Sequence, residues 1–279
     1  MVDLGHVAPA TPTATFGVLL KDWRRRRGTS QLELALRSGV SQRHISFVES
    51  GRAKPSRDMV SVLAGALDVP LRHQNTLLIA AGFAPAWRDS DLAAPELAEV
   101  RNALDRMLAK QEPYPAVVID RMWNLFDSNQ AAQRLTGALL EHAGTRPPAD
   151  RPNLLRMILA PDGLRRVIAN WAEVAQVLTQ STYAELMADG ADAAALAFLE
   201  EILAYPDMPR VLKRDKPSVH QMPVLPVEFV LGRRTVRVFT VIATLGTPQD
   251  IAVQEVRVEL FFPADADSEA YFREQAVTN

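Results

Sequence analysis

The signals that begin and end helices between residues 30 and 50 constrain this chain more than any other feature. Ser30 followed three residues later by Glu33 forms a capping-box pattern, which marks the start of a helix. Gly39 is typical of the left-handed position that ends a helix, and Ser41 then offers a second N-cap. The sequence therefore predicts two short helices, 31–38 and 42–49, joined by a tight turn. The major groove of DNA accepts a helix pair of this kind.

Three further helices are predicted around this pair, over residues 16–27, 56–67 and 69–80. Gly28 ends the first of them after a run of arginines, and Ser56 caps the second. Together the five segments should build one helical domain with a shared apolar core. The core positions expected from helical spacing are Phe16, Leu19, Leu20, Trp23, Leu32, Ala35, Leu36, Ile45 and Val48.

A longer pattern contains these helices: Gln31, Ala35, Gly39, Val40, Ser41, Ile45, Glu49 and Gly51, followed by Lys54-Pro55-Ser56. It resembles the helix-turn-helix of the lambda-repressor (XRE) family, which implies a transcription regulator that binds double-stranded DNA. By motif position the resemblance makes Gln31 a phosphate clamp and makes Gln42, Arg43 and His44 base readers. Glutamine suits adenine and arginine suits guanine. Ser46 can reach a base edge or the backbone, and Arg52 and Lys54 are expected to contact phosphate.

Charge is distributed unevenly along the chain, although the net charge is only -2. Residues 1–88 hold 12 Lys and Arg against 6 Asp and Glu, whereas the remainder holds 19 against 27. A basic first domain suits contact with phosphate. The alternative is a helical bundle for protein contacts with a solvated arginine face.

The 279 residues are enough for a small domain and a larger one. We expect a flexible N-terminus at 1–14, a DNA-binding domain at 15–88, a connecting helix within 89–112 and a second domain at 113–279. The connecting helix could join domains, pair with its copy in a dimer, or lie on its own domain. The chain contains no cysteine, and we recognise neither a leader peptide nor a membrane span, so a cytoplasmic protein is expected.

The second domain combines strand and helix patterns. Residues 116–119 and 123–126 predict a hairpin, and residues 163–188 and 192–203 are largely helical. Strands are expected at 219–224, 227–231, 235–244 and 253–262, with a turn at residues 231–234 between the middle pair. The fold class is therefore an all-α helix-turn-helix domain followed by an α+β domain with an antiparallel sheet, of PAS-like shape.

Several segments of this domain carry a second resemblance: residues 115–129, 161–164, 170–171, 246–250 and 259–265. They look like the MmyB-like regulators. This family implies a PAS-like sensor that holds a small apolar molecule, such as a fatty acid, within its core.

Strand alternation suggests which residues line that pocket. Arg237, Phe239 and Val241 share one face of their strand, and Arg237 would pair with a ligand carboxylate. Trp171 and Phe198 are candidate cavity walls. The alternative is that Arg237 points to solvent and that the apolar side chains are ordinary core.

Catalytic signatures are not evident in the sequence. The five histidines, His6, His44, His73, His142 and His220, lack metal-ligand spacing, and we recognise no nucleophile elbow or phosphate loop. We therefore expect no enzyme, no metal and no cofactor. The predicted partners are double-stranded DNA, a small apolar ligand and a second copy of the chain, but not a membrane. Two alternatives keep the DNA-binding domain: a second domain that serves only dimerisation or protein docking, or one that is an enzyme.

Overall fold

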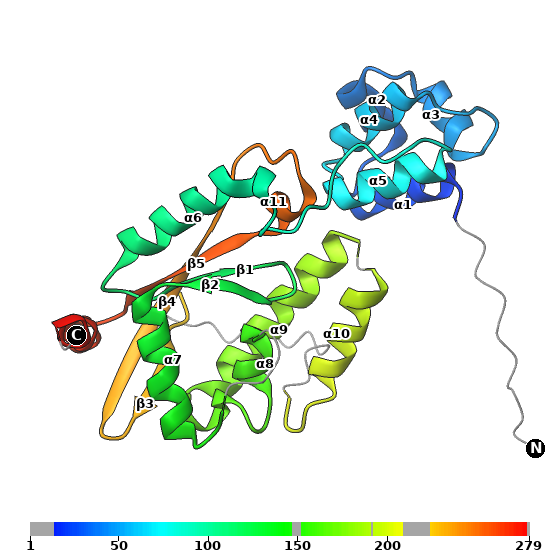
Figure 1. Cartoon of the computed structure of the whole chain (residues 1–279). Helices are drawn as coiled ribbons and strands as arrows, with labels where there is room; N and C mark the ends of the chain where they lie inside the picture. Colours follow the sequence, from blue (N-terminus) through cyan, green and yellow to red (C-terminus); the bar gives the residue numbers. More distant parts are fainter. Residues whose placement is uncertain (1–13, 147–151, 191, 209–223, 278–279) are drawn as a thin grey trace, which may run out of the picture. The chain divides into compact units, whose positions relative to one another are not determined.

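The computed structural model describes residues 14–146, 152–190, 192–208 and 224–277. The chain divides into two compact units, residues 1–88 and 89–279 (Figure 1). Each unit has its own hydrophobic core.

The described part of the first unit, residues 14–88, contains five helices. They are α1 (Phe16–Arg26), α2 (Gln31–Ser38), α3 (Gln42–Glu49), α4 (Arg57–Ala66) and α5 (Leu71–Ala80). The five predicted helices are confirmed, with ends that differ by one or two residues. The fifth starts at Leu71 because Pro70 precedes it with an extended backbone.

Side-chain caps fix the ends of α2 and α3. The Ser30 hydroxyl accepts a hydrogen bond from the Glu33 amide at 3.1 Å, and the Ser30 amide donates to the Glu33 carboxylate at 2.7 Å. Gly39 adopts φ 71°, where a side chain would be strained. The Ser41 hydroxyl then caps α3 by accepting from the His44 amide at 3.3 Å. The predicted helix-turn-helix geometry is thus confirmed.

The core of the first unit corrects one prediction. Leu34 is the fully buried leucine of α2, whereas Leu32 is 54% exposed and Leu36 is 78% exposed. The inner face of α2 runs through Gln31, Leu34 and Ala35, because those positions meet α3 and α4. Phe16, Leu20, Trp23, Ile45 and Val48 are buried as predicted.

The second unit is built on a five-stranded antiparallel sheet with the strand order β2-β1-β5-β4-β3. The strands are β1 (Ala116–Ile119), β2 (Leu125–Ser128), β3 (Val227–Leu231), β4 (Arg234–Thr244) and β5 (Arg257–Pro263). The last strand of the sequence lies between the first and the fourth. The predicted α+β class with an antiparallel sheet is confirmed.

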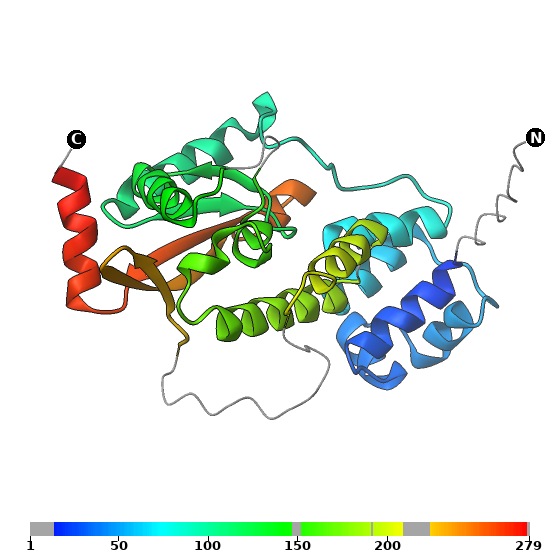
Figure 2. The ribbon, with the colours of Figure 1, turned by 90° about the horizontal axis from the view of Figure 1, so that it is seen from below.

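Helices cover both faces of this sheet (Figure 1). One face carries η1 (Pro95–Leu97) and α6 (Ala98–Gln111). The other carries α7 (Gln130–Ala143), α8 (Leu154–Leu159), η2 (Leu164–Val167), α9 (Trp171–Ala188) and α10 (Ala193–Leu203). The short α11 (Ile251–Glu255) precedes β5, and α12 (Ala266–Val277) follows it and packs on β4 and α7 (Figure 2).

The helix over residues 98–111 lies on the sheet of its own unit, which is one of the three alternatives for it. Leu97, Leu104 and Leu108 are buried against Ala116 and Val118 of β1. Its apolar stripe is therefore used within the unit.

Some boundaries differ from the prediction, and one of them is that of the second hairpin strand, which is expected at 123–126 and runs over Leu125–Ser128 as β2. The strand expected from residue 253 begins at Arg257, because Asp250 caps the short helix α11 before it. The helical stretch 163–188 is interrupted at residues 168–170, where Ile168 bridges to Phe229 of β3. The strand predicted over 219–224 lies, except for Val224, outside the described residues.

Candidate DNA-binding face and ligand cavity

The outer side of α3 presents the predicted reading residues. Gln42 and Arg43 are exposed, and His44 and Ser46 are half-buried. Ile45 and Val48 of the same helix are buried, so the helix is held by one side and leaves the other available. His44 is less accessible to a DNA base than Gln42 and Arg43, because its Nε2 atom is buried. That atom has no hydrogen-bond partner among the described residues.

Phe47 organises two of the predicted DNA contacts. The guanidinium of Arg43 lies 5.3 Å from the centre of its ring, and that of Arg52 lies 6.0 Å from it. Such cation–π contacts restrict flexible side chains without neutralising their charge. None of the ion pairs found in the described part of the chain takes in Arg43, Arg52 or Lys54.

Gln31 is positioned by a buried carboxylate. Its side-chain amide donates to Glu49 at 2.8 Å, and Arg24 donates to the same carboxylate at 2.7 and 3.0 Å. Burial opposes ionisation of Glu49, but the hydrogen bonds from Arg24 and Gln31 outweigh it and hold the pKa below its ordinary value. The amide nitrogen of Gln31 has a second hydrogen, which a phosphate oxygen can accept.

The second unit contains an apolar cavity of about 280 Å³ between the sheet and the helices on one of its faces. Strands β1, β3, β4 and β5 form one wall, and α7, α8, η2 and α9 form the other. The apolar lining residues are Pro115, Val117, Trp123, Ala132, Leu135, Leu139, Leu154, Met157, Ile158, Leu164, Val174, Val177, Leu178, Val224, Leu225, Val227, Phe229, Phe239 and Phe261. A neighbouring hollow of about 420 Å³ near Tyr205 is more polar.

Three polar side chains interrupt the apolar wall: Thr136, Thr240 and Glu259. Glu259 is 5% exposed, and burial raises its pKa to about 7 in spite of a hydrogen bond with Thr240 and the charge of Arg257. Its Oε2 atom has no hydrogen-bond partner among the described residues. The cavity therefore contains one acidic group in an apolar setting.

Four of the five predicted ligand residues lie outside the described lining of this cavity. Arg237 binds Glu228 at 3.2 Å and Asp265 at 3.1 Å, and Val241 is 46% exposed. Trp171 donates to the Ile158 carbonyl at 3.0 Å under the guanidinium of Arg165. Phe198 is buried among the helices and carries Arg156 over its ring.

Phe239 is the fifth, and it does border the cavity. Strand alternation places its side chain on the face opposite Thr240 and Glu259, where its ring stacks on Phe262 at 5.7 Å. Phe239 therefore meets the cavity with its main chain rather than its ring.

Glu259, the most distinctive group of the cavity, is not among the site residues predicted from the sequence. The available signal was a glutamate in the middle of the apolar strand Arg257–Pro263. A charged side chain between two apolar residues, Val258 and Leu260, on a central strand is unusual, because such a strand is covered on both faces.

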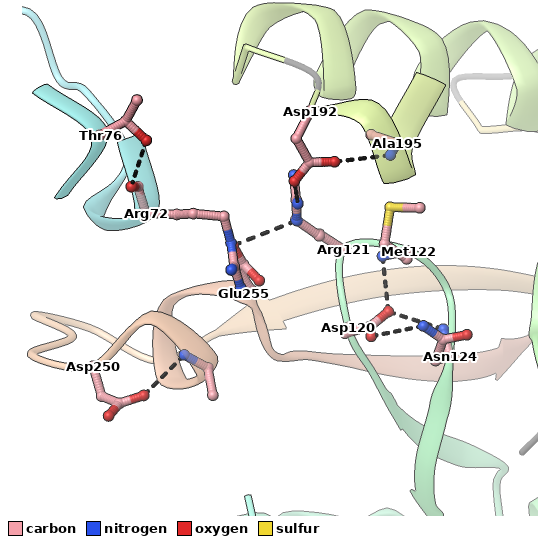
Figure 3. Close-up of polar contacts among 11 residues, drawn as sticks. Arg72, Thr76, Asp120, Arg121, Met122, Asn124, Asp192, Ala195, Asp250 and Glu255 are labelled. Atoms are coloured by element: carbon pink, nitrogen blue, oxygen red, sulfur yellow. Dashed lines mark hydrogen bonds and ion pairs between the residues drawn. The ribbon is translucent and has the colours of Figure 1, made fainter. Parts of the chain in front are cut away.

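Other polar residues of the 115–129 segment shape the backbone (Figure 3). The Asp120 carboxylate accepts from the Met122 amide at 2.8 Å and from both nitrogens of Asn124 at 2.9 Å. Arg121 pairs with Asp192 at 2.5 Å and with Glu255 at 3.4 Å. These contacts fix the β1–β2 turn beside the helices.

Two kinds of feature are absent from the described residues. No group of three or more His, Asp or Glu side chains is arranged to hold a metal ion there. No helix in that part of the chain is long and apolar enough to cross a membrane.

A helix-turn-helix unit joined to a unit with an apolar cavity is the arrangement of a DNA-binding regulator with a ligand-binding domain, and comparison with known proteins agrees. Residues 20–74 match the helix-turn-helix family, and residues 100–274 match the MmyB-like transcription regulator ligand binding domain. The second match spans more than half of the chain, so the chain belongs to the MmyB-like transcription regulators.

Individual relatives are HTH-type transcriptional regulators that are uncharacterized. Two come from the CDC 1551 / Oshkosh and ATCC 25618 / H37Rv strains of Mycobacterium tuberculosis. Each is 31% identical over 117 residues, which is 42% of this chain and 76% of the relative. The resemblances found in the sequence are thus confirmed, and the protein is a DNA-binding transcription regulator with a ligand-binding domain.

Proposed function

We propose that the protein binds a specific operator as a homodimer and changes its affinity for that operator when the cavity of its second unit is occupied. The observation that carries the proposal is an apolar cavity of about 280 Å³ in a chain that also has a helix-turn-helix. Two recognition helices in such a dimer lie about 34 Å apart on a near-palindromic site. A regulator of this kind acts where its DNA is, in the cytoplasm.

On the DNA side, the proposal assigns base contacts to the start of α3. Gln42, Arg43 and His44 would read base edges, with Ser46 in reach of a base or the backbone. Gln31, Arg52 and Lys54 would hold phosphates on either side. The exposure of Arg43 and Lys54 and the stacking of Arg43 and Arg52 on Phe47 support this assignment.

Two substitutions distinguish side chains that contact bases from side chains that contact phosphates. Arg43→Ala should relax sequence choice at one base pair and cost roughly 1–3 kcal/mol of specific binding. Lys54→Ala should weaken specific and random DNA alike and reduce the salt slope by about one. Asp22→Ala, in an exposed pair on α1, is the matched control. Equal losses on specific and random DNA for both substitutions would overturn the assignment.

On the sensor side, the proposal gives the cavity a small apolar ligand of the fatty-acid type in a PAS-like domain. The lining supports it, because nineteen of its twenty-two described members are apolar. The volume supports it as well, because a dry cavity of about 150 Å³ already binds benzene.

Operator selection from random DNA, with and without a panel of fatty acids at fixed salt, tests the whole proposal. An inverted repeat whose recovery changes with one acid supports reader, dimer and sensor together. A repeat that no acid affects removes the fatty-acid sensor; if a fatty alcohol also leaves the repeat unchanged, a second unit used for dimerisation or docking is favoured. Recovery of no enriched sequence would overturn the DNA-binding assignment.

A further inference from the structure

Glu259 occupies a central position in the sheet and in the cavity. It lies on β5 opposite Val117 of β1 and Ile242 of β4, and its side chain belongs to the cavity face. The carboxyl group is 5% exposed and bonds to the Thr240 hydroxyl, while Oε2 has no partner among the described residues.

A carboxyl group in this position lowers the stability of the folded protein when the cavity holds no ligand. A buried oxygen without a hydrogen-bond donor loses its hydration and gains nothing in return, and an apolar residue of similar size would fill the same space. The missing donor can come from a molecule inside the cavity, because Glu259 is part of its wall. Glu259 is therefore suited to bind the polar end of a ligand.

The charges around the cavity decide which polar end fits. No lysine, arginine or histidine is among the described residues of its lining. The cation whose charge acts on Glu259, Arg257 on the same strand, donates to Glu185 of α9 at 2.5 Å. A carboxylate ligand would thus bring a second negative charge to Glu259, and no cation among the described lining residues offsets either charge. A neutral donor such as a hydroxyl group meets no such repulsion.

We propose that the cavity binds an elongated apolar molecule whose uncharged head group donates a hydrogen bond to Glu259, so that a medium-chain alcohol is preferred to a fatty carboxylate. This inference rests on the proposed function, in which the cavity is the ligand site. It replaces the fatty acids of that function with uncharged molecules of similar length whose head group donates a hydrogen bond. The raised pKa of Glu259 agrees with an environment that disfavours additional negative charge.

Calorimetric titration of the full-length protein at pH 8 with three matched probes provides the test. The probes are 1-decanol, which donates a hydrogen bond, decyl methyl ether, which only accepts, and decanoate, which is charged. Wild-type protein should bind 1-decanol at least about tenfold more tightly than either of the others. The ether comparison requires no variant, so it does not depend on a substitution that could disturb folding.

Glu259→Gln provides the matching change in the protein. A side-chain amide offers both an acceptor and a donor, so this variant should bind decanoate at least about tenfold more tightly than wild-type protein does. Glu228→Gln, on β3 and paired with Arg237 away from the cavity, is the control and should leave all three affinities unchanged.

The outcomes separate the inference from the function on which it rests. If 1-decanol binds most tightly and Glu259→Gln improves decanoate, the inference is supported. If decanoate binds wild-type protein as tightly as 1-decanol, the cavity is a ligand site but the head-group assignment is overturned. If none of the probes binds, the proposed sensor fails and the inference fails with it.

Discussion

Glu49 at the end of α3 binds Arg24 at the end of α1 through two hydrogen bonds of 2.7 and 3.0 Å. Their side chains are only 3% and 12% exposed, and Gln31 of α2 donates to the same carboxylate. Three of the five helices of the first unit therefore meet at one ion pair. This network aligns the proposed phosphate clamp with the reading helix.

Removing the carboxylate should therefore weaken the first unit. Glu49→Ala leaves the guanidinium of Arg24 buried without its partner, and we expect a loss of about 3–5 kcal/mol in the free energy of unfolding. Urea unfolding followed by helical circular dichroism measures it. Asp22→Ala removes the exposed pair with Arg26 on the same helix and should cost less than about 0.5 kcal/mol. Similar small losses for both variants would show that the network contributes little to stability.

The close approach of α1 and α3 depends on Gly17. A β-carbon at this position would lie 2.4 Å from the Val48 carbonyl oxygen and 2.7 Å from that of Glu49, and backbone atoms cannot move aside easily. Gly17→Ala should lower the thermal midpoint of the first unit and cost more than about 1 kcal/mol. Gly65→Ala, in α4 with open space around it, should instead stabilise by about 0.5–1 kcal/mol. The same sign for both variants would contradict this packing.

Local signals in the sequence were sufficient for the first unit, because caps and turns are short-range. Ser30, Glu33, Gly39 and Ser41 define the helix-turn-helix without reference to the rest of the fold. Which side of α2 is buried was not predictable in the same way, since Leu32, Leu34 and Leu36 are equally apolar. Contacts with α3 and α4 select Leu34.

This selection is itself testable. Leu34→Ala removes a fully buried side chain and should cost about 2–5 kcal/mol in the free energy of unfolding. Leu36→Ala removes one that is 78% exposed and should change stability by less than about 0.5 kcal/mol. Urea unfolding of both variants under the same conditions makes the comparison. A larger loss for Leu36→Ala would restore the original assignment of the inner face.

The cavity is formed by strands that pair over long distances in the sequence. The sequence therefore predicts that a cavity exists but not which residues line it. Arg237 was expected to face a ligand, but Glu228 on the neighbouring strand and Asp265 before α12 bind it instead. Asp265 is far from Arg237 in sequence, but Glu228 lies opposite Arg237 in the predicted hairpin, so the turn at residues 231–234 already indicated one of the two pairs. Glu259 enters the cavity because β5 lies between β1 and β4, a strand order that alternation within a single strand does not reveal.

The same buried carboxyl group predicts how stability depends on pH. Burial raises the pKa of Glu259 from an ordinary 4.5 to about 7 in the folded protein, against the opposing effects of Thr240 and Arg257. Between these values the folded state retains a proton that the unfolded state has lost, so stability falls as pH rises through this window. A shift of this size corresponds to roughly 3 kcal/mol at pH 8.

Glu259→Gln isolates this contribution, because glutamine does not titrate. Relative to wild-type protein, the variant should gain stability steadily between pH 5 and pH 7 and keep a constant advantage above pH 7. Urea midpoints of the two proteins at half-unit pH steps measure the difference, and comparison with the parent cancels the carboxylates of lowered pKa, such as Glu49 and Asp265. A difference that stays constant from pH 5 to pH 8 would mean that the pKa of Glu259 is not raised in the folded protein, as expected if its carboxyl group were hydrated.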